Sequence, residues 1–247
     1  MLDTMIDLKL KFDNIKKRGW IESISRGNGN VGITLENKLN KERENLPIAD
    51  YKGIEIKTNI KEKSRPYITL FSAAPDGKYI YQTKILKDKY GIPDKIYKKY
   101  KILYARVNSK NYKKINNIYM KLNVNYKEQK IILEIYNKDY KLIEKDCFWD
   151  FDTIEKKINT KIKYLAYISA SKKYENQKVY FYYKDIKFYK IKSIKQFLYL
   201  IDIGMINICF KVGFYKQKNK FGNTYDHGTG FEIKKENLKQ LYNEIKL

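Results

Sequence analysis

A strand signal between residues 50 and 58 constrains the fold of this chain more than any other feature. After a turn glycine, isoleucines at 54 and 56 alternate with Glu55 and Lys57. Side chains two apart on a strand project from the same face. Ile54 and Ile56 are therefore expected to face a core, while Glu55 and Lys57 lie side by side on the opposite face.

Asp50 precedes this strand and adds a second carboxylate to it. Carboxylate oxygens are ligands that Mg²⁺ prefers, and we expect Asp50 and Glu55 to bind it together with the backbone carbonyl of Ile56. A neighbouring ammonium group orients water and offsets charge on a phosphate, which is the role expected of Lys57. Asp50, Glu55 and Lys57 are together the smallest set of side chains that metal-dependent hydrolysis of a phosphodiester requires.

The same spacing occurs a second time, at Asp150, Glu155 and Lys157. Acidic residues in a first turn and isoleucines at 154 and 158 predict a helix there. Residues two apart on a helix diverge by roughly 200°, so Glu155 and Lys157 cannot share a site. Only the first match is a candidate active site.

A loop rich in glycine and asparagine lies at residues 26–30, and Val31, Leu35 and Leu39 then recur every four residues. This pattern predicts a loop that opens a helix. The loop is either a plain helix start or a place where backbone N–H groups approach a phosphate. On the second interpretation, three of its side chains contact DNA: Arg26, Asn28 and Asn30.

Glu36 lies on that predicted helix. It is either a further active-site carboxylate, which binds a second ion or holds Lys57 in place, or an exposed helix residue. Both interpretations stay open at this point.

The net charge of +24, from 52 Lys+Arg against 28 Asp+Glu, favours a polyanionic partner such as nucleic acid. A composition rich in Lys, Ile, Asn and Tyr is also typical of proteins from AT-rich genomes. Only five of the 52 cationic residues are Arg, which fits such a bias. Cys147 and Cys209 are too few for a disulfide framework and lack metal-ligand spacing. With no apolar run of membrane length and no signal-peptide pattern, we expect a cytoplasmic protein without a membrane partner.

Further elements follow from periodicity and turn residues. We expect helices at 2–17, 152–162 and 194–201, and mainly surface helix and loop at 78–114. Strands are expected at 67–72, as a neighbour of the Glu55 strand, and at 118–124, 131–136, 164–170, 179–183, 205–214 and 230–233.

The basic loop between the last two strands surrounds His227, the only histidine. A lone histidine is more often structural, and without another one no Ser/His/Asp triad is possible. Cations and amides precede it, and these groups suit phosphates and major-groove base edges. We therefore interpret the loop as a DNA-contacting element, with these residues: Lys216, Lys218, Lys220, Tyr225, Asp226, His227 and Thr229.

The order of motifs resembles the MvaI/BcnI-type restriction endonucleases, relatives of the strand-nicking mismatch-repair enzyme MutH. The resemblance rests on Arg26-Gly27-Asn28, Gly32-x-Thr34-Leu35-Glu36, Asp50-x4-Glu55-Ile56-Lys57-Thr58, Leu70-Phe71, Trp149-x-Phe151-Asp152, Lys163 to Ala170, and Asp226 to Phe231. It implies an α/β fold with a PD-(D/E)xK core, a mixed central sheet flanked by helices, and a two-lobed clamp around duplex DNA. Glu36, Asp50, Glu55 and Lys57 would be its active-site residues.

The resemblance also implies Mg²⁺ as cofactor, action as a monomer, and short sites such as CCWGG or CCSGG. A cognate methyltransferase is the expected partner system. Residues 1–190 are expected to form the catalytic lobe and 191–247 the DNA-recognition lobe, with 80–140 as a candidate contribution to the second lobe.

The chain departs from the family pattern mainly at positions expected to contact bases. Ile33 replaces a lysine, Cys209 and Lys211 replace Asp and Arg, Tyr225 replaces a histidine, and Glu232 replaces an arginine. Exchanging base-edge donors and acceptors costs about 1–3 kcal/mol per contact. Lys211 and Glu232 are therefore expected to contact DNA and, as a hypothesis, to alter the recognition sequence.

Three functions remain in competition. The first is a type II restriction endonuclease, and the second a MutH-like nickase that needs an activating partner. The third is a DNA-binding protein without catalysis, for which the intact acidic and lysine set has no obvious use.

Overall fold

The computed structural model describes residues 1–25, 27, 29–39, 49–60, 66–79 and 81–247. The chain forms two compact units, each assembled from separate parts of the sequence. The first contains residues 1–66, 158–192 and 242–247, and the second contains 67–157 and 193–241. In the described part of the chain, no helix has both the length and the apolar character needed to span a membrane.

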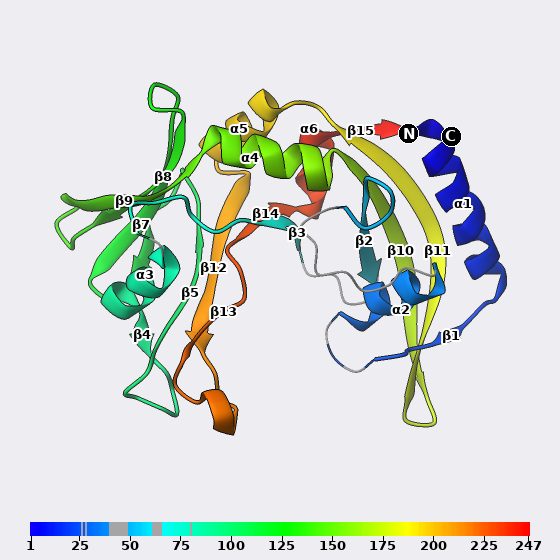
Figure 1. The fold of residues 1–247 in the computed structure, drawn as a ribbon, viewed down its shortest axis with the longest axis horizontal. Coiled ribbons are helices and arrows are strands. Elements are labelled where there is room, and N and C mark those ends of the chain that lie inside the picture. The colour runs from blue at the N-terminus through cyan, green and yellow to red at the C-terminus, as the bar shows by residue number, and fades with distance from the viewer. Residues whose placement is uncertain (26, 28, 40–48, 61–65, 80) are drawn as a thin grey trace. The chain divides into compact units, whose positions relative to one another are not determined.

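The first unit is built on a mixed five-stranded sheet (Figure 1). Its strands run in the order β1-β11-β10-β2, and β15 also pairs with β11. Of the strand pairs described in this unit, β2–β10 is parallel and the others are antiparallel. The strand bounds are β1 (Ile21–Glu22), β2 (Ile54–Ile60), β10 (Tyr164–Glu175), β11 (Lys178–Ile191) and β15 (Tyr242–Ile245).

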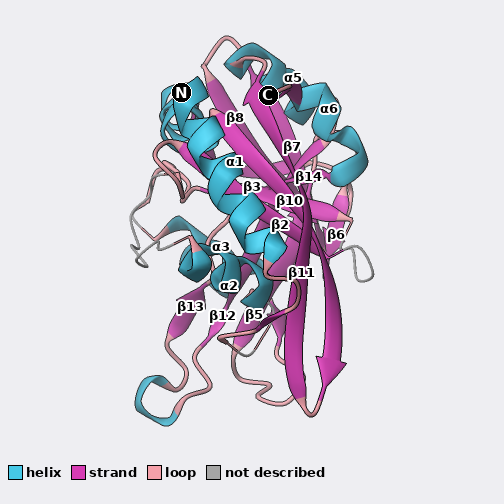
Figure 2. Ribbon diagram, turned by 90° about the vertical axis from the view of Figure 1, so that its right-hand side faces the viewer, coloured by secondary structure: helices cyan, strands magenta, loops and turns pink. Residues whose placement is uncertain are grey.

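The described residues of this unit also form two helices and one π-helical turn: α1 (Leu2–Lys17), α2 (Asn30–Lys38) and η2 (Ile158–Ile162). The helix α1 lies along β11, as Figures 1 and 2 show from two directions. It buries Met5, Leu8, Phe12 and Ile15, the i, i+3, i+4 stripe expected from the sequence. This stripe packs with Leu35 of α2 and the inner faces of β2, β10 and β11 in one core.

The second unit contains two antiparallel sheets. A six-stranded sheet has the order β3-β14-β12-β5-β4 with β13 paired to β12, and a four-stranded meander has the order β6-β7-β8-β9. The first sheet comprises β3 (Tyr67–Ser72), β4 (Ile92–Pro93), β5 (Lys101–Val107), β12 (Ile206–Phe214), β13 (Thr224–Asp226) and β14 (Gly230–Lys234). The meander comprises β6 (Lys113–Ile115), β7 (Ile118–Asn125), β8 (Lys130–Tyr136) and β9 (Leu142–Asp150).

Aromatic side chains form the centre of the second unit. Phe231 stacks on Phe71 with ring centroids 4.8 Å apart and meets Trp149 edge-on at 5.8 Å. The buried Trp149 indole donates to the carbonyl of Ala73 at 3.1 Å. Helices and short helical turns complete the unit: α3 (Gln82–Tyr90), α4 (Phe151–Lys157), α5 (Ile194–Asp202), η3 (Lys218–Lys220), η4 (Lys235–Asn237) and α6 (Leu238–Leu241).

Most predicted elements are confirmed, including the helices at 2–17 and 194–201 and the hairpin of β7 and β8. The second Asp-x4-Glu-x-Lys match lies on α4, so Glu155 and Lys157 are helical as predicted. The helix predicted to reach residue 162 is α-helical only to Lys157 and continues as the π-helical turn η2.

Three predictions are corrected. The strand β3 is not a neighbour of β2, because it pairs with β14 in the sheet of the second unit. The segment 78–114 contains the expected helix α3 and loops, but it is not confined to the surface, since the unpredicted strand β5 buries Leu103, Ala105 and Val107 on one face. The strand predicted at 179–183 extends over the whole of β11, paired along β10.

The chain also divides differently from the predicted boundary between residues 190 and 191. Residues 67–157 and 193–241 form one compact unit. Which unit contacts DNA stays a prediction.

Candidate active site

Among the described strands, β2 lies at the edge of its sheet and has β10 as its one neighbour in the strand order. Glu55 lies opposite Leu165, and Lys57 lies opposite Tyr167, in a parallel register. Ile54 and Ile56 are buried in the core cluster. The alternation predicted from the sequence is therefore confirmed.

A tight turn positions Asp50 at the start of this strand. Tyr51 and Ile54 exchange two backbone hydrogen bonds of 2.8 Å each. The two residues between them, Lys52 and Gly53, have φ of 43° and 89°. Positive φ at both central residues is the requirement of a type I′ turn, which explains the glycine.

The helix α1 anchors the turn through the side chain of Tyr51. The buried Tyr51 hydroxyl donates to Asp7 Oδ2 at 2.7 Å and accepts from Lys11 Nζ at 2.6 Å. Both partners come from one helical face, because they are four residues apart. The residue next to Asp50 is thus fixed to the body of the unit.

Asp50 is half-buried and its Oδ2 accepts a hydrogen bond of 3.0 Å from the backbone N–H of Ile56. This hydrogen bond holds the Asp50 carboxylate beside the backbone of Ile56, between Glu55 and Lys57. Its charge is close enough to help raise the pKa of Glu55. Asp50 and Glu55 therefore lie together at one end of β2.

Glu55 is buried, with 2% of its surface exposed, between two lysines. Its Oε1 accepts from Lys57 Nζ at 2.6 Å, and Lys161 Nζ lies 3.7 Å from its Oε2. Among the described residues, no side chain or backbone group donates a hydrogen bond to the buried Oε2. Burial raises the pKa of Glu55, and Asp50 adds to this, while the charge of Lys57 opposes it.

Lys161 was not identified from the sequence. It belongs to η2, where the π-helical turn places it beside Glu55, and its side chain is 25% exposed. Single π-helical turns inside helices frequently occur at functional sites. The sequence holds no pattern that predicts such a turn, so the contact could only be found in the structure.

Glu36 lies on α2 and is half-buried. A Cβ added to Gly32 of the same helix would lie 3.7 Å from Glu36 Oε1 and 3.4 Å from Thr58 Oγ1. Glu36 is therefore near Thr58, on the face of β2 that also carries Ile56. Its role in the reaction stays a prediction.

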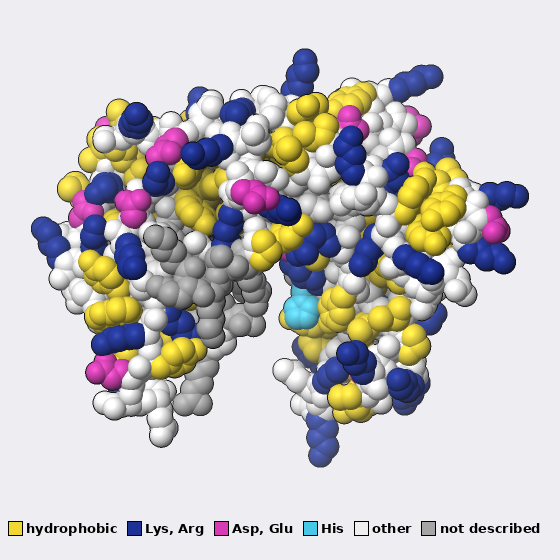
Figure 3. Space-filling model, turned by 180° about the vertical axis from the view of Figure 1, so that it is seen from behind, with side chains coloured by type: hydrophobic (Ala, Val, Ile, Leu, Met, Phe, Trp, Pro, Cys, Tyr) yellow, Lys and Arg dark blue, Asp and Glu magenta, His cyan; other side chains and the backbone are white. Residues whose placement is uncertain are grey.

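The residues predicted to contact DNA divide by their exposure. Lys218, Lys220, Asp226 and the lone His227, coloured cyan in Figure 3, are exposed. Lys216 forms an ion pair of 3.3 Å with Asp94. Tyr225 is half-buried, and its ring centroid lies 4.2 Å from that of His227.

Other predicted DNA-contacting residues are buried. Asn30, Thr229 and Glu232 are 6%, 1% and 4% exposed. Burial favours a supporting role for these three, and their contact with DNA stays a prediction. Arg26 and Asn28 lie outside the described residues.

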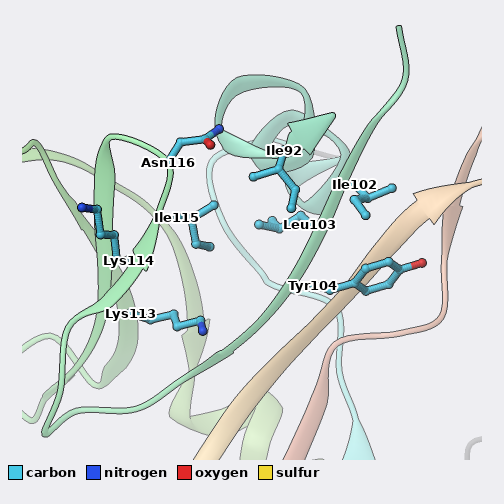
Figure 4. Close-up of a pocket in the computed structure, with 8 residues that line it drawn as sticks. All are labelled: Ile92, Ile102, Leu103, Tyr104, Lys113, Lys114, Ile115 and Asn116. Atoms are coloured by element: carbon cyan, nitrogen blue, oxygen red, sulfur yellow. The ribbon is translucent and has the colours of Figure 1, made fainter. Parts of the chain in front are cut away.

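A pocket of about 290 Å³ lies in the second unit, between β4, β5 and β6 (Figure 4). It is lined by Ile92, Ile102, Leu103, Tyr104, Lys113, Lys114, Ile115 and Asn116. The lining contains no carboxylate, so the pocket lacks the groups needed for metal-dependent hydrolysis.

Residues 9–242 match the model of the MvaI/BcnI restriction endonuclease family. The chain belongs to this family. It is therefore an enzyme of the restriction endonuclease class, which confirms the family resemblance seen in the sequence.

Two solved structures of one family member are similar to the chain. The restriction endonuclease MvaI in complex with its cognate DNA substrate has a TM-score of 0.89 and 31% identity, over 99% of this chain and 98% of that one. MvaI in the absence of DNA has a TM-score of 0.64 and 28% identity over the same shares. The PD-(D/E)xK fold predicted from the sequence is thereby confirmed. The comparison with curated proteins found no match to the chain.

Restriction endonucleases of this kind generally use a divalent metal ion. The described residues contain no group of three or more His, Cys, Asp or Glu side chains arranged for a metal. Asp50 and Glu55 nevertheless fit a hard cation, because a buried carboxylate oxygen of Glu55 accepts no hydrogen bond from any residue that the structure describes. Two carboxylates are enough for Mg²⁺, which usually keeps several water ligands.

Proposed function

We propose that this family member hydrolyses phosphodiester bonds of double-stranded DNA, with Mg²⁺, at the cluster of Asp50, Glu55 and Lys57. The proposal rests on how these three side chains are arranged along β2. There, a buried carboxylate pairs with Lys57 at 2.6 Å, and a second carboxylate is fixed on the amide of the intervening residue. Such a set suits a reaction in which negative charge develops on a phosphate.

Each residue has a distinct task in this proposal. Asp50 and Glu55 would hold the ion, aided by the carbonyl of Ile56, and Lys57 would orient the attacking water and offset charge on the phosphate. When bound, the ion would supply Lewis acidity toward the phosphate and would favour hydroxide over water. Lys161 would keep Glu55 ionised, since an ammonium group beside a buried carboxylate opposes the cost of burial. Glu36 would act from α2 on a second ion.

Double-stranded DNA is the proposed substrate. Support comes from the similar MvaI structure, which is a complex with cognate DNA substrate, and from the net charge of +24. A polyanion gains affinity for such a surface by releasing its counterions. The exposed Lys218 and Lys220 provide the charge near His227.

We further propose that the enzyme cuts a short site that differs from those of its relatives. Cys209, Lys211 and Glu232 occupy positions where we expect the family to present other donors and acceptors. In this chain Lys211 Nζ and Glu232 Oε1 bind each other at 2.7 Å. A lysine paired with a glutamate presents different groups to a base than the two arginines expected at positions 211 and 232 would.

The remaining proposals concern the setting of the enzyme. It would act as a monomer in the cytoplasm, with a cognate methyltransferase that protects host DNA. A cleavage rate proportional to enzyme concentration, down to the lowest measurable concentration, tests the monomer. A rate that falls with a higher power of concentration contradicts it.

Digestion of an unmethylated, mapped plasmid with Mg²⁺ tests the proposed function. We expect linear product with ends at one short sequence, determined by run-off sequencing, and no product in EDTA. Accumulation of nicked circles without linear product would favour the nickase. Specific binding without any cutting would favour a non-catalytic DNA-binding protein.

A further inference from the structure

One face of the sheet in the second unit brings polar side chains from four adjacent strands together. In the register of these strands, Arg106 lies opposite Cys209, and Glu232 lies opposite Thr69. Lys211 shares the face of Cys209, because it is two residues further along β12. The opposite face is the apolar core, where Phe210 and Phe231 are fully buried.

Glu232 is the centre of this face. Its Oε2 accepts from Arg106 twice, from Nε at 3.1 Å and from Nη2 at 2.7 Å. Its Oε1 accepts from Lys211 Nζ at 2.7 Å and from Thr69 Oγ1 at 3.2 Å. A carboxylate has about four acceptor sites, so these contacts saturate Glu232. It has no capacity left for the amine of a cytosine, the contact expected of an acidic base reader.

Arg106, by contrast, keeps donors for a ligand. Its two hydrogen bonds to Glu232 use two of the five N–H groups of a guanidinium, and three are not used by that contact. Its guanidinium also lies 3.9 Å from the ring centroid of Tyr67. The salt bridge and the stacked ring fix the plane of a side chain that is still 40% exposed.

Lys211 is the second cation on this face. Its Nζ reaches Glu232 while its own side chain stays 36% exposed. A Cβ on the neighbouring Gly230 would meet Thr69 Cγ2 closely, at 3.3 Å, and Lys211 Nζ at an ordinary contact distance of 3.6 Å. Two cationic donors thus surround one saturated carboxylate.

We propose that Arg106 and Lys211, held by Glu232, read the O6 and N7 acceptors of a guanine in the major groove. This inference rests on the proposed function, and it makes Glu232 a positioning residue rather than a base reader. A planar fork with fixed orientation suits the paired acceptors of guanine, which is the commonest specific contact in major grooves. Phosphates do not need this rigidity, and Lys218 and Lys220 are exposed for them.

Cleavage of a randomised duplex library, followed by sequencing of the ends, tests the proposal. The decisive variant is Arg106→Lys, which keeps the charge beside Glu232 but loses the fork. We expect wild type to require a guanine, and Arg106→Lys and Glu232→Gln to relax the preference at that same position only. Lys127→Ala, in the exposed turn between β7 and β8, is the control for loss of a surface cation and should keep the wild-type profile.

A second readout uses the wild-type site with that guanine replaced by 7-deazaguanine, which lacks the N7 acceptor. We expect wild-type cleavage to slow roughly 10- to 150-fold, the range for loss of one hydrogen bond to a charged group, while Arg106→Lys slows far less. A profile unchanged by Arg106→Lys would overturn the inference. So would an equal loss on every sequence, since that indicates a phosphate contact. If wild type itself cut at no defined site, the proposed function would fail first.

Discussion

Lys57 Nζ lies 2.6 Å from Glu55 Oε1, although Glu55 is buried and its pKa is raised. The pair exists because residues two apart on β2 share one face, and because β2 is the edge strand of its sheet. The parallel partner β10 fixes the register of both residues. An ammonium and a carboxylate are thus held together on a strand that has a sheet neighbour on one side only, as far as the described residues extend.

Replacement of Lys57 tests its part in the chemistry. We expect Lys57→Ala to lower the single-turnover cleavage rate about 10²–10³-fold, the range for loss of one preorganised charge at a transition state. DNA binding measured with Ca²⁺ in place of Mg²⁺ should change little.

The second sequence match supplies the control. Lys157→Ala removes a lysine from the same spacing on the helix α4, and it should cleave as wild type does. Equal losses in Lys57→Ala and Lys157→Ala would contradict the assignment of the site to β2.

Thermal unfolding tests whether Glu55 binds a metal. Mg²⁺ at 100 times its Kd should stabilise wild type by about 2.7 kcal/mol, and Glu55→Gln should lose this gain. In EDTA near neutral pH, Glu55→Gln should be at least as stable as wild type, because it removes a buried carboxylate with a raised pKa. Glu155→Gln is the matched control, and a metal effect that persists in Glu55→Gln would place the ion elsewhere.

The ion pairs of Glu232 predict a pH dependence of stability. Burial alone would raise the pKa of Glu232, but the hydrogen bonds from Lys211 and Arg106 outweigh it and hold the pKa below its ordinary value of 4.5. A lowered pKa contributes stability that is present above pH 4.5 and is lost as the pH falls through the folded-state value.

Comparison with Glu232→Gln isolates this group from the other carboxylates. Wild type should be more stable than Glu232→Gln by about 1–2 kcal/mol near neutral pH. The gain is no larger because solvent screens the charges of the partly exposed Lys211 and Arg106. In urea titrations the difference should shrink below pH 4.5, the ordinary value for this carboxyl. A difference that grows on acidification would contradict the prediction.

The Tyr51 hydroxyl is expected to matter for both stability and rate. Tyr51→Phe removes the hydrogen bonds to Asp7 and Lys11, which should cost about 0.5–1.5 kcal/mol of unfolding free energy. The turn that positions Asp50 should loosen, so cleavage should slow while DNA affinity stays unchanged. The exposed Tyr199 offers the control Tyr199→Phe, for which neither quantity should move.

Local periodicity predicted much of the fold and the main cluster. The alternation around Glu55 and the helical spacing around Glu155 were enough to separate two identical patterns. Partners distant in sequence are not predictable, because the pattern that predicts a strand does not indicate which other strand pairs with it. For this reason β3 was assigned to the wrong sheet, and Lys161 was missed beside Glu55.

The same limit applies to base-reading residues. Glu232 was expected to contact DNA from its position in the motif, whereas its contact with Arg106, 126 residues away, depends on the register of β5, β12 and β14. The alternation in β5 was obscured by its lysine and tyrosine content. Only the assembled sheet brings the two side chains together.

Anomalous diffraction from crystals containing Mn²⁺ tests the central claim most directly, because Mn²⁺ favours the same oxygen ligands as Mg²⁺. The account predicts a peak bound by the carboxylates of Asp50 and Glu55, with Lys57 beside it. A peak only at other residues, with Glu55 still paired to Lys57 and Lys161, would contradict it.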